Sequence, residues 1–182
     1  MNKKNEVAKF ILMGLVMGSI VLIAATAPNA ARVLLAHSGR NDRKRKNSIE
    51  RAIRRLERRN LIRFVRQSGK EILEITGAGK ERLRAFELDN LKLSLPKCWD
   101  KLWTVIMFDI PEKKKNARDA LRIKLEELGC FAFHKSVFIH PAFCADEIDF
   151  VAECFQVSNF ITHFRTPTLG RQEYRARRFF KM

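Results

Sequence analysis

The chain has 182 residues, with 36 Lys or Arg against 20 Asp or Glu, a formal charge of +16 and a pI near 10.2. This excess attracts polyanions, so nucleic acid is the first expected partner and an anionic membrane the second. A content of 46% hydrophobic residues with 8 Gly and 5 Pro excludes a disordered chain, and four Cys without a pattern argue against a disulfide scaffold.

The first predicted element is an apolar helix within Phe10 to Ala27, eighteen residues without a charge. As a helix this segment would extend roughly 27 Å, close to the thickness of a bilayer core. We favour a buried first helix, with a membrane helix and a secretory signal ending at Ala27 as alternatives. Pro28 is a poor residue after a cleavage site, and it is well placed to begin a second helix that ends at Gly39.

The next element, Arg43 to Arg66, begins as an amphipathic basic helix. A step of about 100° per residue gathers one apolar stripe made of Ile49, Ala52, Ile53 and Leu56. The opposite half carries polar and cationic side chains, namely Lys44, Asn47, Arg51, Arg54, Arg55 and Arg58. Between residues 40 and 66, twelve Lys or Arg oppose three acids, an imbalance that a merely solvated helix rarely has. This layout is typical of a recognition helix in a DNA groove.

Two short strands follow, over residues 61–66 and 71–76, and the segment that joins them contains Gly69, which suits a hairpin turn. A basic helix followed by a hairpin predicts a winged helix-turn-helix. Arg66 and Lys70, at the ends of the joining segment, complete the set of predicted DNA contacts. A further helix is predicted over residues 76–89.

An extended connector, in which Pro96 halts any helix, marks a boundary between two domains. We expect the winged helix-turn-helix at residues 1–88, a linker at 89–101 and a second domain at 102–182. The second domain is predicted to contain a strand at 103–110, a helix at 116–128, strands at 130–133 and 135–141, a helix at 146–155 and a strand at 160–164. This βαββαβ order predicts a ferredoxin-like domain, and thus an α+β chain.

The basic tail, residues 171–181, either adds a phosphate contact or frays.

The segments WDKLWTVIMFDIPEKKKNARDALRIKLEELG and HKSVFIHP closely resemble the central domain of the phenylacetate-pathway (PaaX-like) repressor family, which is similar to the CRISPR-associated Cas-two fold. The resemblance is specific from Trp99 to Pro141 and rests on the order of elements elsewhere. It implies a homodimeric regulator, expected to be a repressor, that binds double-stranded DNA in the cytoplasm without a cofactor. Some family members carry a further C-terminal domain associated with effector response, so the resemblance leaves a small-molecule effector unknown and not expected here.

Asp109, in the sequence FDIPE, supports a competing enzyme hypothesis. The Cas-two resemblance implies that an Asp at the end of the first strand binds a divalent metal such as Mg²⁺ at the dimer axis of an endonuclease. We favour a structural Asp109 that caps the turn into the next helix or pairs with Lys113 or Arg118. Zinc is a weaker alternative, because the candidate ligands Cys130, His134, His140 and Cys144 lack the close spacing of a typical site.

Overall fold

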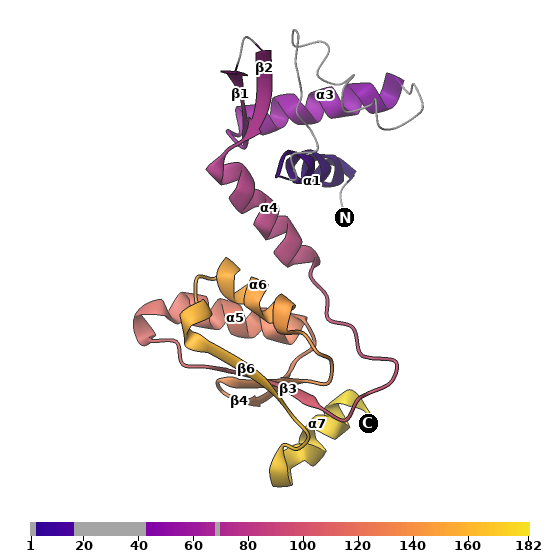
Figure 1. Cartoon of the computed structure of the whole chain (residues 1–182), viewed down its shortest axis with the longest axis vertical. Helices are drawn as coiled ribbons and strands as arrows, with labels where there is room; N and C mark the ends of the chain where they lie inside the picture. The colour runs from indigo at the N-terminus through magenta and orange to yellow at the C-terminus, as the bar shows by residue number, and fades with distance from the viewer. Residues whose placement is uncertain (1–2, 17–42, 68–69) are drawn as a thin grey trace. The chain divides into compact units, whose positions relative to one another are not determined.

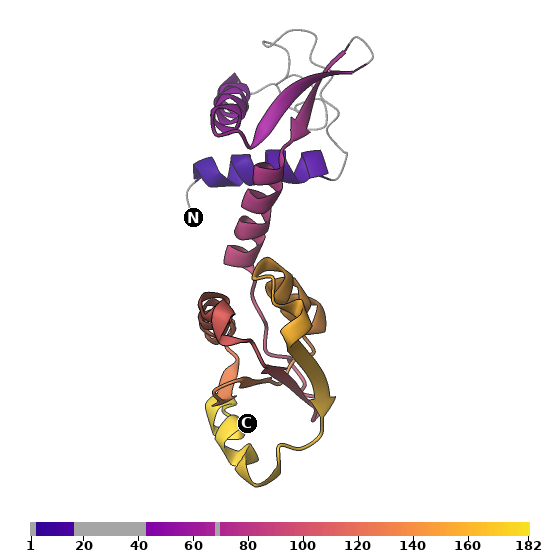
Figure 2. The same cartoon turned by 90° about the vertical axis from the view of Figure 1, so that its left-hand side faces the viewer.

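The structure is a computed structural model that describes residues 3–16, 43–67 and 70–182, drawn in Figure 1 and Figure 2. The chain divides into two compact units, residues 1–87 and 88–182. Helices combine with one two-stranded and one four-stranded antiparallel sheet, which confirms the predicted α+β class.

The described residues of the first unit form two helices, a hairpin and most of a third helix. Its elements are α1 (Lys3–Val16), α3 (Arg43–Arg58), β1 (Ile62–Gln67), β2 (Lys70–Ile75) and α4 (Gly77–Asn90), of which α4 continues past the division after Glu87. Both predicted strands exist within one residue of their predicted bounds. They pair antiparallel, with Ile62 opposite Ile75 and Gln67 opposite Lys70.

The core of the first unit forms where α1, α3, the hairpin and α4 meet. The predicted apolar stripe of α3 is confirmed, because Ile49, Ala52, Ile53 and Leu56 are all buried. They pack in one cluster with Ile11, Leu12, Ile62, Leu73, Leu83 and Phe86. The apolar side of α3 is therefore anchored, and its polar side faces outward.

A tight junction connects α3, the hairpin and α4. Asn60 adopts the left-handed conformation with φ 57°, which ends α3 and turns the chain into β1. The Thr76 hydroxyl donates to the Asn60 carbonyl at 2.7 Å and accepts from the Gly79 N–H at 3.0 Å, so it caps the start of α4. Gly79 lies so close to the Leu61 carbonyl that a Cβ at this position would collide with it.

Only Phe10 to Val16 of the apolar segment lie among the described residues, as the second half of α1. Ile11 and Leu12 are fully buried there, whereas Phe10 and Val16 are exposed. Residues 17–27 and the predicted second helix from Pro28 lie outside the described residues. Within the ranges that are described, no helix combines the length and the apolar character that crossing a membrane requires.

The second unit has the predicted βαββαβ order followed by one further helix. Its elements are β3 (Trp103–Phe108), η1 (Glu112–Lys114), α5 (Lys115–Glu127), β4 (Phe131–His134), β5 (Val137–His140), α6 (Ala145–Cys154), η2 (Ser158–Phe160), β6 (Ile161–Thr166), η3 (Gly170–Gln172) and α7 (Glu173–Phe180). The spatial order β4-β5-β3-β6, antiparallel throughout, is the ferredoxin-like arrangement.

The sheet of the second unit has α5 and α6 on one side and α7 on the other (Figure 1, Figure 2), and it separates two cores. On one face, Ile106 and Phe108 of β3 pack with Leu121 and Leu125 of α5 and with apolar residues of α6. On the other face, Trp103 and Val105 of β3 pack with Ile139, Ala176 and Phe180. Because successive strand residues point to opposite faces, β3 supplies both cores.

The connector before β3 and the C-terminal tail both pack against this unit. The predicted linker, residues 89–101, begins inside α4, and its Leu91 and Leu93 pack against the core of the second unit. Trp99 lies 4.7 Å from Trp103, measured between ring centroids. The tail does not fray, because α7 buries Ala176 and Phe180 and thereby gains a tertiary anchor.

Candidate nucleic-acid interface

The cationic side of α3 lies opposite its buried stripe. Arg51, Arg54 and Arg58 are exposed, and Arg55 is half-buried. Lys44 and Asn47 belong to the same helix, but their side chains lie outside the described part of the structure. Arg55 and Arg58 lie in the last turn of α3, where positive charge is favourable beside the helix C-terminus.

Arg59 was missed by the sequence analysis and also belongs to this basic region. It is exposed directly after α3 and follows Arg55 by four residues, so it continues the same helical row. Its backbone N–H donates to the Arg55 carbonyl at 3.2 Å, which keeps it in helical continuation. The i, i+4 spacing could have identified it before the structure was known.

The hairpin carries two further predicted contacts in a less basic setting. Arg66 is exposed on β1, in register with Glu71, and Lys70 begins β2 opposite Gln67. Nearer the base of the hairpin, the Arg63 guanidinium pairs with Glu74 at 2.7 Å across the two strands. The strongest concentration of positive charge in the described part of the first unit is thus on α3 and its end.

The carboxylate of Asp109 lies at the end of β3, exposed to solvent. Its backbone N–H donates to the Phe160 carbonyl at 2.9 Å, and this bond holds the chain after the last β3 residue. The structural role that we favoured for its carboxylate is wrong. Pro111 occupies the cap position before η1, and Arg118 pairs with Glu112 at 2.9 Å, since Glu112 begins the turn that leads into α5.

An open depression of about 560 Å³ adjoins Asp109 on the sheet. Its lining includes apolar and small polar side chains, from Met107, Phe108, Asp109, Ser136, Val137, Asn159, Phe160 and Thr162. Asp109 is the one carboxylate in that lining, and the residues that the structure describes contain no group of three or more His, Cys, Asp or Glu able to hold a metal ion. A metal at this place would therefore need ligands beyond one copy's carboxylate.

The four Cys and His residues of the zinc alternative lie in different environments. Cys130, His140 and Cys144 are buried, whereas His134 is exposed on β4. Burial raises the pKa of the Cys130 thiol and raises that of Cys144 to about 11. Among the residues that the structure describes, no group of three or more His, Cys, Asp or Glu could hold a metal ion, so these four residues are not gathered into a zinc site.

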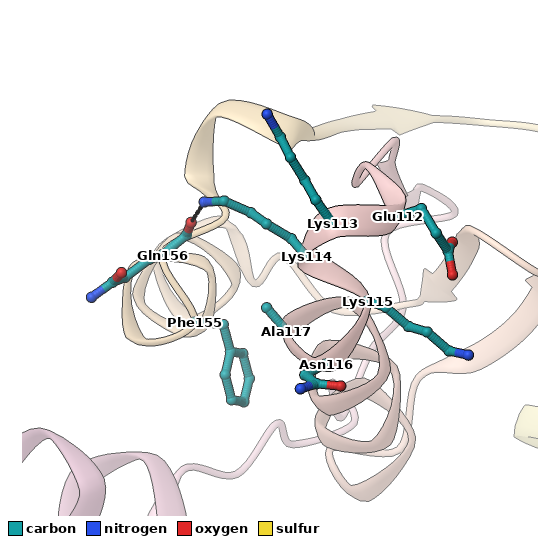
Figure 3. A pocket seen from close by; sticks show the side chains of 8 residues that line it. All are labelled: Glu112, Lys113, Lys114, Lys115, Asn116, Ala117, Phe155 and Gln156. Carbon is teal, nitrogen blue, oxygen red and sulfur yellow. Dashed lines mark hydrogen bonds between the residues drawn. The ribbon is translucent and has the colours of Figure 1, made fainter.

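A second depression, of about 420 Å³, lies at the start of α5 and is drawn in Figure 3. Three consecutive lysines contribute to it. The Lys114 ammonium donates to the Gln156 carbonyl at 2.9 Å and lies 5.3 Å from the Phe160 ring centroid, while Lys113 and Lys115 extend in other directions. This arrangement uses Lys114 to connect the start of α5 with the end of α6.

Comparison with protein families identifies the second unit. Residues 96–177 match the model of a family described as the PaaX protein central Cas2-like domain. The second unit therefore contains a domain similar to the central Cas2-like domain of PaaX proteins. The match extends from Pro96 into α7 and includes Asp109, which confirms the resemblance seen in the sequence. No curated protein matches the chain.

Proposed function

We propose that this PaaX-like chain is a homodimeric regulator of transcription that binds double-stranded DNA and represses its target. The observation that carries the proposal is the two-sided character of α3. One side is buried in the core of the first unit, and the other presents Arg51, Arg54 and Arg58 to solvent. Such a helix is held rigidly and can still place guanidinium groups against phosphates.

The first unit would act as a winged helix-turn-helix, with α3 as the recognition helix and the β1–β2 hairpin as the wing. The junction at Asn60, Thr76 and Gly79 supports this proposal, because it holds the hairpin at a defined position beside α3. The proposed DNA contacts are Lys44, Asn47, Arg51, Arg54, Arg55, Arg58, Arg66 and Lys70. Arg59 extends the set by one residue.

The second unit would form the homodimer. Its sheet leaves Met107 and Phe164 exposed, and Met107 lines the depression beside Asp109. Burial of such apolar side chains by a second copy would favour association. A twofold dimer would then present two α3 helices to two DNA half-sites. We place this regulator in the cytoplasm and propose neither a cofactor nor a small-molecule effector.

A metal-dependent endonuclease is the second candidate, and the observation that favours it is the exposed carboxylate of Asp109, which makes no ion pair with the described residues. In a dimer, two copies of Asp109 could supply two carboxylates, a donor set that suits Mg²⁺. Each carboxylate would then hold the ion, which would supply Lewis-acid chemistry at a phosphodiester. The chain's own contribution would be Asp109 and the open surface beside it.

Footprinting of the full chain on its own upstream region, with Mg²⁺ and with chelator, separates the candidates. Protection of a discrete site in both conditions, without strand breaks, is the expected result. Strand breaks that need Mg²⁺ would favour the endonuclease. Absence of any protected site, including on promoters of neighbouring operons, would contradict the repressor proposal.

A further inference from the structure

The C-terminal helix α7 presents a basic and aromatic surface that the proposed winged helix does not use. From Gly170 to Met182 the chain carries five cations, Arg171, Arg175, Arg177, Arg178 and Lys181, against the single acid Glu173. Glu173 is already engaged, since it accepts from the Leu169 N–H at 3.1 Å and pairs with Arg177. Four cations therefore remain without a compensating carboxylate on this segment.

The buried side of α7 fixes how these cations are displayed. Ala176 and Phe180 pack into the core with Trp103 and Val105. At about 100° per residue, Tyr174 and Arg178 fall on the side of the helix opposite to this buried pair. Both are exposed, Tyr174 by 67%. The outer ridge of α7 thus consists of a phenol and a guanidinium group.

Arg175 is held in place by aromatic rings on the neighbouring strand β4. Its guanidinium carbon lies 5.7 Å from the ring centroids of both Phe131 and Phe133. One of its nitrogens donates to the Gln172 side chain at 2.9 Å. A stacked guanidinium keeps other N–H groups available in a fixed plane, which suits the geometry of phosphate oxygens. Preorganisation of this kind reduces the entropy that is lost on binding.

The composition of this surface favours a nucleic acid over a lipid surface. A helix that lies on a membrane needs a free apolar face, but the apolar residues Ala176 and Phe180 of α7 are already buried. Phe179 is half exposed and lies against Phe131, with 5.0 Å between ring centroids, so it leaves one ring edge outward and not a continuous apolar face. What remains outward is cationic and aromatic, the combination that contacts phosphates and sugars.

We propose that the α7 basic surface, formed by Arg171, Tyr174, Arg175, Arg178 and Lys181, binds the sugar-phosphate backbone of duplex DNA. The inference rests on the proposed function for the identity of the polyanion, and it assigns phosphate contacts to the second unit in addition to those of α3. Contacts of this type add affinity and salt dependence without reading base sequence.

The test compares two triple variants of the full chain that remove the same charge. Arg171, Arg178 and Lys181 are changed to Gln in the α7 variant, and Lys92, Lys97 and Lys113 in the control. All six side chains are exposed and make no ion pair within the described part of the chain, so both variants should fold. Near-ultraviolet circular dichroism confirms that each does.

Affinity for duplex DNA of random sequence is measured over a range of KCl concentrations. Each phosphate that the protein no longer neutralises lowers the slope of log K against log salt by about 0.9, so the α7 variant should lose up to about 2.7. Its affinity should fall by roughly tenfold or more relative to the control variant. Binding of both variants to anionic phosphatidylglycerol vesicles is measured in parallel. Equal slopes and affinities for DNA in the two variants would overturn the inference. An α7 variant that loses affinity for the vesicles but not for DNA would overturn it as well.

A third variant, in which Arg51, Arg54, Arg55 and Arg58 are changed to Gln, keeps this inference separate from the proposed function. If only that variant loses DNA affinity, the repressor proposal stands and the α7 surface is refuted. If only the α7 variant loses affinity, the α7 surface stands and α3 is the wrong interface. Failure of the wild-type chain to bind duplex DNA would refute both.

Discussion

Asp100 and Arg165, which are 65 positions apart in sequence, form a bidentate ion pair with nitrogen–oxygen distances of 2.7 and 2.9 Å. Arg165 also donates to the Leu102 carbonyl at 3.1 Å. The pair ties the segment that leads into β3 to the edge strand β6. It thus explains why residues 99–102 behave as part of the second unit although they contain no helix or strand.

This pair predicts a loss of stability in acid. The Arg165 hydrogen bonds hold the pKa of Asp100 below its ordinary value of 3.8, so its contribution is complete above that pH and is lost as the pH falls through the native pKa. Asp100→Asn should lower the thermal midpoint at pH 7 and make it less sensitive to acid. Thermal unfolding of both proteins at pH 7 and pH 3 measures the effect, and an unchanged midpoint at pH 7 would contradict it.

His140 predicts a second pH effect, at higher pH. Burial lowers its pKa to about 4 from an ordinary 6.5, and its Nδ1 accepts from the Ala142 N–H at 3.1 Å, which requires that nitrogen to carry no proton. As the pH falls, the imidazole of His140 is protonated in the unfolded chain before it is protonated in the folded chain. The free energy of unfolding should therefore fall by about 2 kcal/mol between pH 7 and pH 5. Urea unfolding at both pH values measures the fall. It should largely disappear in His140→Asn, and a wild type with equal stability at both pH values would refute the assignment.

Gly79 predicts a steric effect with an internal control. A Cβ at Gly79 would collide with the Leu61 carbonyl and the Ile75 side chain, whereas a Cβ at Gly77 meets no atom within 4 Å. Gly79→Ala should therefore destabilise the chain by about 1–3 kcal/mol, because backbone must move. Gly77→Ala, in the same helix, should be neutral or slightly stabilising. Equal unfolding free energies for the two variants would show that the close approach is absent.

The arginines on the outward side of α3, three of them exposed and Arg55 half-buried, should carry most of the affinity for DNA. In the Arg51, Arg54, Arg55 and Arg58 to Gln variant, the salt slope should fall by about 0.9 for each phosphate that is no longer neutralised, up to about 3.6. A charge-matched control changes four exposed cations on α4 and the connector, namely Lys80, Arg84, Lys92 and Lys97. Fluorescence anisotropy with labelled duplex provides both slopes. A variant that binds as the control does would remove α3 from the interface.

Asp109 separates the regulator from the nuclease. Its carboxylate makes no described ion pair or hydrogen bond, so Asp109→Asn should change stability by less than about 0.5 kcal/mol. In a regulator, DNA affinity should stay equal or rise slightly as repulsion from phosphate falls. Wild type and variant are incubated with duplex DNA and RNA in Mg²⁺, Mn²⁺ and chelator. Cleavage by wild type that needs the metal and vanishes in the variant would promote the endonuclease.

The spacing of apolar residues made much of the fold predictable from the sequence, because buried faces of helices and strands repeat with a fixed period. The stripe Ile49, Ala52, Ile53 and Leu56 identified α3 and its buried side, and the apolar run from Trp103 identified a strand buried on both faces. The actual strand stops at Phe108, two residues before the predicted end, and the next N–H bonds to Phe160, a partner that is distant in sequence. Such long-range partners leave no local pattern.

The candidate site was less predictable than the fold, for the same reason. The pairing of Glu112 with Arg118, which leaves Asp109 exposed, depends on how η1 leads into α5. Helix α7 is ordered because Phe180 packs on Trp103, with 5.9 Å between the ring centroids. Trp103 lies some seventy residues earlier in the sequence. A basic tail that reads as frayed in isolation becomes a fixed surface once that ring is in place.

The two-sided burial of β3 also limits how this protein can change over evolutionary time. Five of its six side chains are buried, four of them in one core or the other, and Met107 alone is exposed. Insertion or deletion of a single residue within the strand would exchange the two sets of core residues beyond that point, so the strand tolerates neither. Substitutions that alter surface recognition are therefore confined, on this strand, to a single position. Met107 lies in the lining of the depression beside Asp109, where an unbranched, polarizable side chain adapts readily to a new neighbour.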